Sequence, residues 1–208
     1  EHNPSWRKWP FSISCCCLLM SDVEELLAAF NAGTLVRPSP TALNLVDLSR
    51  TIMTLLEVDG VEATSGSQEI AELIGPFDHL IFVMADGLGL EFIKQLDDDA
   101  FLSRHLIKVL QTVFPSATAA ALTSVATGQW PGRHAVTGWW THLPEIGLAS
   151  TILLFTTRSD ARPLSRLGVT PEQAYPEPSL FRSIERNALA LLPERISQSV
   201  YSVYFSGG

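Results

Sequence analysis

The sequence lacks any concentration of positive charge. It contains 14 lysine and arginine residues against 22 aspartate and glutamate residues, and its formal net charge is −8. The largest basic cluster is the pair Arg7-Lys8. Proteins that bind nucleic acid need a basic patch to neutralise phosphates, so we expect no nucleic-acid duplex among the partners. An acidic protein can still bind phosphate esters where metal ions supply the positive charge.

Cysteine is also scarce. The chain has only three cysteines, and they are adjacent at Cys15-Cys16-Cys17. This spacing offers neither a disulfide framework nor a metal-binding pattern. Arg7-Lys8 and the apolar residues that follow imitate a short signal peptide. However, Met20 is followed by Ser21 and an acidic first turn, which is typical of a helix start. We therefore expect Met20 to be the true start, residues 1–19 to be an upstream or non-native extension, and the protein to be cytoplasmic; a secreted or lipid-anchored protein is the alternative.

A long purely apolar run is also missing. No charged residue lies between Val109 and Gly132, but hydroxyl side chains and Pro115 interrupt this stretch. It therefore predicts a buried strand, turn and helix, and no membrane span. A chain of 208 residues with 46% hydrophobic and 17% charged residues is typical of a globular domain.

The apolar pattern alternates between strands and helices. Buried strands are expected at residues 79–85, 107–114 and 149–157. The helices expected from residue 41 onward include 41–57, 68–74, 90–96, 100–105, 117–126, 179–192 and 194–203. Such alternation predicts a mainly parallel sheet covered by helices on both faces.

Two segments carry residues suited to catalysis. Asp86-Gly87 ends the first expected strand, and Ser116 and Thr118 open the helix that follows the second. Sites in open α/β sheets lie at the carboxyl ends of strands, and helix N-termini favour anions. This arrangement indicates metal-assisted phosphoryl transfer, and because no histidine stands beside Thr118 to act as a base, activation of its hydroxyl by a metal is favoured if Thr118 is the nucleophile. Ser116 is the rival nucleophile, and either hydroxyl could simply cap the helix.

The order Asp86-Gly87, Pro115 to Thr118, Thr127-Gly128, Pro131 and His134-Ala135 resembles the alkaline phosphatase superfamily, and most closely its type I phosphodiesterase/nucleotide pyrophosphatase family. The resemblance covers residues 77–140. Ala135 stands where the family has glycine. Ala121 stands where pyrophosphatases place asparagine, which argues against a nucleotide substrate.

The resemblance implies a three-layer α/β/α sandwich with a mainly parallel sheet, incomplete at its C-terminus. Residues 20–76 are then an N-terminal helical segment that packs on the core, and residues 77–208 are the N-terminal part of the catalytic domain. Two divalent metal ions are implied, zinc with manganese as the alternative. Asp86 is their ligand, and Thr118 is both ligand and nucleophile. The implied substrate is a small-molecule phosphate ester.

The ligands that would complete such a site are scarce in this chain. After Thr118 the only histidines are His134 and His142 and the only aspartate is Asp160, and we interpret His134 as a structural imidazole. We expect the remaining ligands to lie beyond residue 208 and these 208 residues to be nearly inactive. Two alternatives stay open: an isomerase that resembles phosphoglycerate mutase, and a non-catalytic chain.

Overall fold

The computed structural model describes residues 21–35, 39 and 41–208. The predictions for residues 1–19 lie outside this part. The chain divides into two compact units, Glu1–Arg37 and Pro38–Gly208, and each is considered by itself.

The first unit contains one described helix, α1 (Asp22–Asn31). The Ser21 hydroxyl accepts a hydrogen bond from the Glu24 N–H, and the Glu24 carboxylate accepts one from the Ser21 N–H at 2.8 Å. This reciprocal pair satisfies two of the donors that a helix start leaves free. The capping box predicted from the sequence is therefore confirmed.

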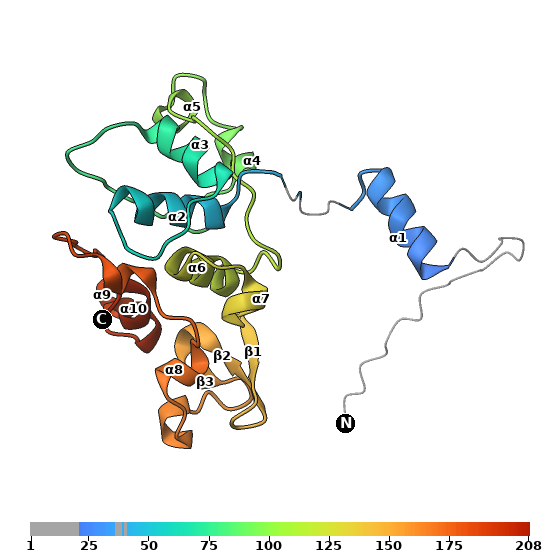
Figure 1. The fold of residues 1–208 in the computed structure, drawn as a ribbon. Helices are drawn as coiled ribbons and strands as arrows, with labels where there is room; N and C mark the ends of the chain where they lie inside the picture. The colour runs from blue at the N-terminus through green and yellow to red at the C-terminus, as the bar shows by residue number, and fades with distance from the viewer. Residues whose placement is uncertain (1–20, 36–38, 40) are drawn as a thin grey trace, which may run out of the picture. The chain divides into compact units, whose positions relative to one another are not determined.

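The second unit is built around α6 (Thr118–Thr127). In Figure 1, α6 lies between the α2 and α3 helices on one side and α7 and the small sheet on the other. The longer helices of this unit are α2 (Leu45–Leu55), α3 (Ser65–Ile74), α6 and α10 (Val200–Ser206). Single-turn helices are α4 (Leu90–Ile93), α5 (Phe101–Arg104), α7 (Pro131–His134), α8 (Pro171–Ala174), α9 (Glu194–Ser197), and the 3₁₀ turns Ile152–Leu154, Leu164–Leu167 and Leu180–Ser183.

A buried carboxylate joins α2 to the start of α3. Asp47 accepts hydrogen bonds from the Asn44 N–H at 3.2 Å and from the Thr64 hydroxyl at 2.6 Å. Gly66 packs against it so closely that a Cβ there would lie 2.5 Å from Asp47 Oδ2. The close fit of Gly66 and the shared carboxylate hold the two helices together.

The small residues of α6 allow its neighbours to approach closely. The Ser49 hydroxyl of α2 donates to the Val125 carbonyl of α6 at 2.6 Å. On another side, Ala119 belongs to a buried cluster with Ile152, Leu164 and Tyr201. Alanine, serine and threonine therefore let α6 serve as the central helix of this unit.

The sheet differs from the prediction. Its three strands, β1 (Trp140–Leu143), β2 (Leu148–Thr151) and β3 (Thr156–Thr157), are antiparallel and follow the order β1-β2-β3. The protein is thus α/β in the general sense, but the predicted sandwich around a parallel sheet is wrong. The only parallel pairing in the described part is an isolated bridge between Asn44 and Gln111.

The expected strands at residues 79–85 and 107–114 are not strands. Ile81 is 83% exposed and Val83 is 79% exposed, although both were expected to be buried. Parallel strands need a crossover that packs back onto the sheet, usually a helix. Here the intervening chain forms only α4 and α5, each of four residues, so no continuous crossover helix covers the two runs.

The helix expected at residues 179–192 is also wrong beyond its first turn. Only Leu180–Ser183 is helical, as a 3₁₀ turn, and no helix or strand follows until Glu194. Leu189 and Leu191 are 83% and 85% exposed. A short helix depends on burying one face, and these leucines have no surface to cover.

Among the described residues, none of the helices has the length and apolar character that a membrane span requires.

Candidate active site

Thr118 occupies the first position of α6, at a helix start that has no side-chain cap. Ala117 is the N-cap residue, with φ −83° and ψ 146°, and it has no side-chain oxygen to accept a hydrogen bond. The first intrahelical bond runs from the Ala121 N–H to the Ala117 carbonyl. The N–H groups of Thr118, Ala119 and Ala120 therefore donate to no described residue. Neither proposed cap is found, since Ser116 and Thr118 make no such bond.

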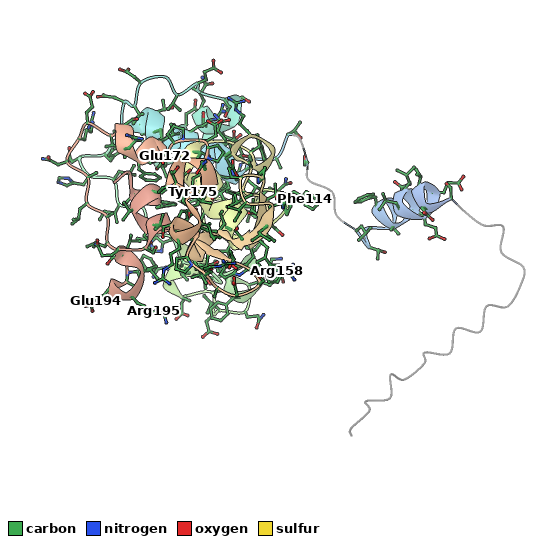
Figure 2. All side chains as sticks on the ribbon, turned by 90° about the horizontal axis from the view of Figure 1, so that it is seen from below. Phe114, Arg158, Glu172, Tyr175, Glu194 and Arg195 are labelled. Carbon is green, nitrogen blue, oxygen red and sulfur yellow. The ribbon has the colours of Figure 1, made fainter. Side chains whose placement is uncertain are left out.

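The hydroxyl of Thr118 is also free. It is partly buried and has no hydrogen bond to a described residue, whereas Ser116 is exposed. The chain enters this turn through a cis peptide bond between Phe114 and Pro115. Figure 2 shows Phe114 at the rim of the unit, where the side chain is 70% exposed. Phe114 and Ser116, which lead into α6, are therefore exposed, whereas Thr118 itself is partly buried.

Asp86 lies in an exposed turn. Gly87 has φ 80°, the left-handed conformation that glycine adopts easily. No hydrogen bond or ion pair in the described structure joins Asp86 to Thr118, and no three described His, Cys, Asp or Glu side chains gather where a metal ion could bind. The assignment of Asp86 as metal ligand and of Thr118 as nucleophile therefore stays a prediction.

Asp160, the one aspartate after Thr118, serves a local turn instead. It accepts a hydrogen bond from the Thr157 hydroxyl and forms an ion pair with Arg162 at 3.2 Å. The Thr157 hydrogen bond, with a smaller contribution from Arg162, lowers the pKa of this carboxyl. Asp160 therefore stabilises the end of β3.

His134 is fully buried between α7 and α6. Its Nε2 lies 2.9 Å from Ser124 Oγ, and its Nδ1 accepts a hydrogen bond from the Val136 N–H at 3.2 Å. Since Nδ1 is the acceptor, Nε2 carries the proton and donates it to Ser124. Burial lowers the pKa of His134 to about 4, so the ring is neutral at pH 7. This geometry matches the structural imidazole expected from the sequence.

The depressed pKa of His134 predicts a pH-dependent stability. The unfolded state binds a proton near pH 6.5 and the folded state only near pH 4. Stability is therefore complete above pH 6.5 and falls as the pH approaches 4, by about 3 kcal/mol in total. Urea unfolding between pH 7 and pH 5 checks this, with His134→Gln as the control. An equally steep slope in that variant would assign the effect to other groups.

Two backbone positions around this histidine have positive φ. Gly128 ends α6 in the left-handed conformation at φ 61°, as its interpretation as a helix C-terminal residue predicted. Ala135 ends α7 at φ 63°. A side chain makes this conformation unfavourable. The glycine that the family places at this position therefore has a structural reason, which is the turn after His134.

Ala135→Gly is accordingly expected to stabilise the protein. Relief of the left-handed strain should exceed the larger chain entropy of glycine and raise the free energy of unfolding by about 0.5–1 kcal/mol. Ala126→Gly, inside α6, should change it by about 1 kcal/mol in the opposite direction. Chemical denaturation of both variants checks the pair. Loss of stability in Ala135→Gly would show that the turn tolerates alanine without strain.

The comparisons with known proteins agree with the order of these segments. The model of the type I phosphodiesterase / nucleotide pyrophosphatase family matches residues 80–148. No curated protein and no solved structure matches the chain. The matched segment contains Asp86, Thr118 and His134, and the family predicted from the sequence is confirmed there. Residues 80–148, about a third of the chain, are thus similar to the type I phosphodiesterase / nucleotide pyrophosphatase family, and this similarity suggests a phosphoester hydrolase.

Proposed function

We propose that the protein hydrolyses small-molecule phosphate esters with Thr118 as nucleophile. The observation that carries this proposal is the uncapped start of α6. The Thr118 N–H has no described acceptor and stands beside the free hydroxyl of the same residue, while the N–H groups of Ala119 and Ala120 also lack a described acceptor but are fully buried. A phosphate oxygen accepts such hydrogen bonds readily, and the helix dipole favours its negative charge.

The proposed chemistry proceeds in two displacements. Thr118 Oγ1 forms a bond to phosphorus while the bond to the leaving alcohol breaks, and the proton that the Thr118 hydroxyl loses ends on the leaving oxygen. Water then attacks the phosphothreonine, restores the hydroxyl and releases the phosphorylated product. The Thr118 N–H at the start of α6 would hold a non-bridging oxygen in both steps. His134 is no base for this reaction, because its Nδ1 is already an acceptor and its Nε2–H is directed at Ser124.

Metal dependence is a separate part of the proposal. We propose two divalent ions, zinc or manganese, with Asp86 and Thr118 among their ligands, as the motif resemblance implies. The described residues do not fit such a centre, since no three potential ligands come together. We therefore assign no step to a metal and propose that further ligands lie outside these 208 residues. On this proposal the 208 residues alone are nearly inactive.

The lack of three neighbouring metal ligands among the described residues also favours a second candidate, a chain that folds without catalysing turnover. The two candidates differ in what α6 does with phosphate. An anion-binding helix start belongs to the first and is not required by the second.

Titration with inorganic phosphate, followed by backbone NMR, tests the proposed site. The amide signals of Thr118, Ala119 and Ala120 should shift in a saturable way. The starts of α2 and α3 are internal controls, because Asn44 and Thr64 already cap them. Equal shifts at all three helix starts, or none at α6, would contradict the proposal.

Hydrolysis of a p-nitrophenyl phosphodiester with added zinc or manganese separates the candidates further. Turnover by the 208 residues would refute the expected lack of ligands. Turnover only in a longer natural form of the protein would support it. If every form lacks turnover, the non-catalytic candidate holds.

A further inference from the structure

Two buried hydroxyl groups face each other across the small sheet without a hydrogen-bond partner. Thr141 is 7% exposed and Ser150 is fully buried. Neither Thr141 Oγ1 nor Ser150 Oγ has a partner in the described structure. Buried polar atoms in native proteins are almost always satisfied by protein or by ordered water. Two such atoms together therefore require an explanation.

The strand register places these hydroxyls on one face. Thr141 of β1 is paired directly with Ser150 of β2, and Ser150 is paired with Thr157 of β3. Directly opposite residues of antiparallel strands lie on the same face, with Cβ atoms about 4.5–5.5 Å apart. The three hydroxyl residues thus form a buried row across the sheet.

Thr157 has hydrogen-bonding capacity left over. Its hydroxyl donates to Asp160 and accepts from the Arg162 N–H at 3.0 Å. A hydroxyl oxygen has two lone pairs, so one remains available. The row therefore offers two hydroxyls without any hydrogen bond and one additional acceptor. These three groups lie within the range of two to four partners that a buried water molecule needs.

We propose that Thr141 and Ser150 hold one ordered water molecule, with Thr157 as its third partner. The water receives the hydroxyl hydrogen of Thr141 or Ser150 and donates its own hydrogens to the remaining oxygens. It ties the three strands together on their buried face. It also explains why hydroxyl residues occupy a face that otherwise carries the buried Leu143.

A double-mutant cycle tests this site. Thr141→Val and Ser150→Ala each remove one partner and nearly preserve side-chain volume. Each variant is expected to lower the Tm by about 2–4 °C. The double variant should lower it by less than the sum, because both changes remove the same bridge. The control cycle combines Thr141→Val with Ser103→Ala on α5, whose Oγ is also unpartnered, and should be additive.

Water contacts give a second, independent measurement. NMR magnetisation transfer from a long-lived water to the amides of Thr141 and Ser150 should be present in the native protein and absent in the double variant. A rise in Tm in both single variants would show that the hydroxyls are unsatisfied and overturn the proposal. Coupling without a water signal would also overturn it, because it would indicate a direct bond between the hydroxyls.

Discussion

Replacing Thr118 with alanine is expected to abolish phosphate-ester hydrolysis in a form of the protein that turns over. The loss should be on the order of 10⁴-fold or more in kcat, as for other enzymes that lose a covalent nucleophile. The alanine variant would keep the helix start and its free N–H groups, so phosphate binding should persist. The measurement is the rate of p-nitrophenol release alongside the phosphate titration.

Two neighbouring variants make this result specific. Thr118→Ser retains a hydroxyl at the same place and should keep part of the activity. Ser116→Ala should leave both activity and stability nearly unchanged, because Ser116 is exposed and makes no capping bond. Mass spectrometry of a trapped intermediate should locate phosphate on Thr118. Phosphate on Ser116, or full activity in Thr118→Ala, would refute the assignment.

Tyr201→Ala is expected to be the most destabilising substitution that we predict. Tyr201 is 5% exposed, and its ring lies 5.5 Å from that of Tyr175 and 5.8 Å from that of Tyr204, centroid to centroid. Its hydroxyl lies 3.0 Å from Thr123 Oγ1 of α6. Burial raises the pKa of Tyr201, so the hydroxyl stays protonated as a donor. Removing the ring should cost about 3–5 kcal/mol.

The hydroxyl and the ring can be separated experimentally. Tyr201→Phe keeps the ring and should cost only about 1 kcal/mol, since the Thr123 hydroxyl still donates to the Ala119 carbonyl at 2.7 Å. Leu154→Ala is a surface control, because Leu154 is 65% exposed. Urea unfolding of the three variants gives the comparison. A loss in Tyr201→Ala no larger than in Leu154→Ala would mean that α10 does not anchor α6.

Helices were predicted better than strands, although the helix expected at residues 179–192 is wrong beyond its first turn. The expected helix at 117–126 is α6 (Thr118–Thr127), and the one expected at 41–57 contains α2 (Leu45–Leu55). The signals that limit a helix, such as Ser21 at the start of α1 or Gly128 at the end of α6, act within a few residues. Local chemistry is therefore sufficient to predict them.

Strands depend on partners that the pattern does not specify. Residues 79–85 have the apolar composition of a buried strand, yet no described strand pairs with them. Conversely, the residue types of β1 do not alternate between polar and apolar, although their burial does. Trp140 and His142 are exposed, so the strand could not be predicted from its composition. Its role comes from pairing with β2, which is a property of the folded chain.

The sequence predicted the local setting of single residues of the candidate site, but not the contacts between them. The position of Thr118 at a helix start followed from Pro115 and the small residues after it, and the structure adds the missing cap. The buried pair of Ser124 and His134 was only half predicted. His134 was expected to be structural, but Ser124 carried no signal, because a serine in a small-residue helix has no distinctive neighbours in sequence. The partner of Ser124, His134, lies on the neighbouring helix α7.

The close packing around α6 limits where this protein can vary. Larger side chains along Ala119, Ala120 or Ala126 would overpack a helix that is buried among its neighbours. Ser116 and Phe114, immediately before the helix, are exposed and meet no such restriction. If α6 binds the substrate as proposed, substitutions that change substrate choice are therefore tolerated at the exposed positions before the helix, while the buried positions within it keep nearly fixed side-chain volumes. On the proposed function, Thr118 lies between an exposed segment whose side chains can change in size and a buried helix whose side chains cannot.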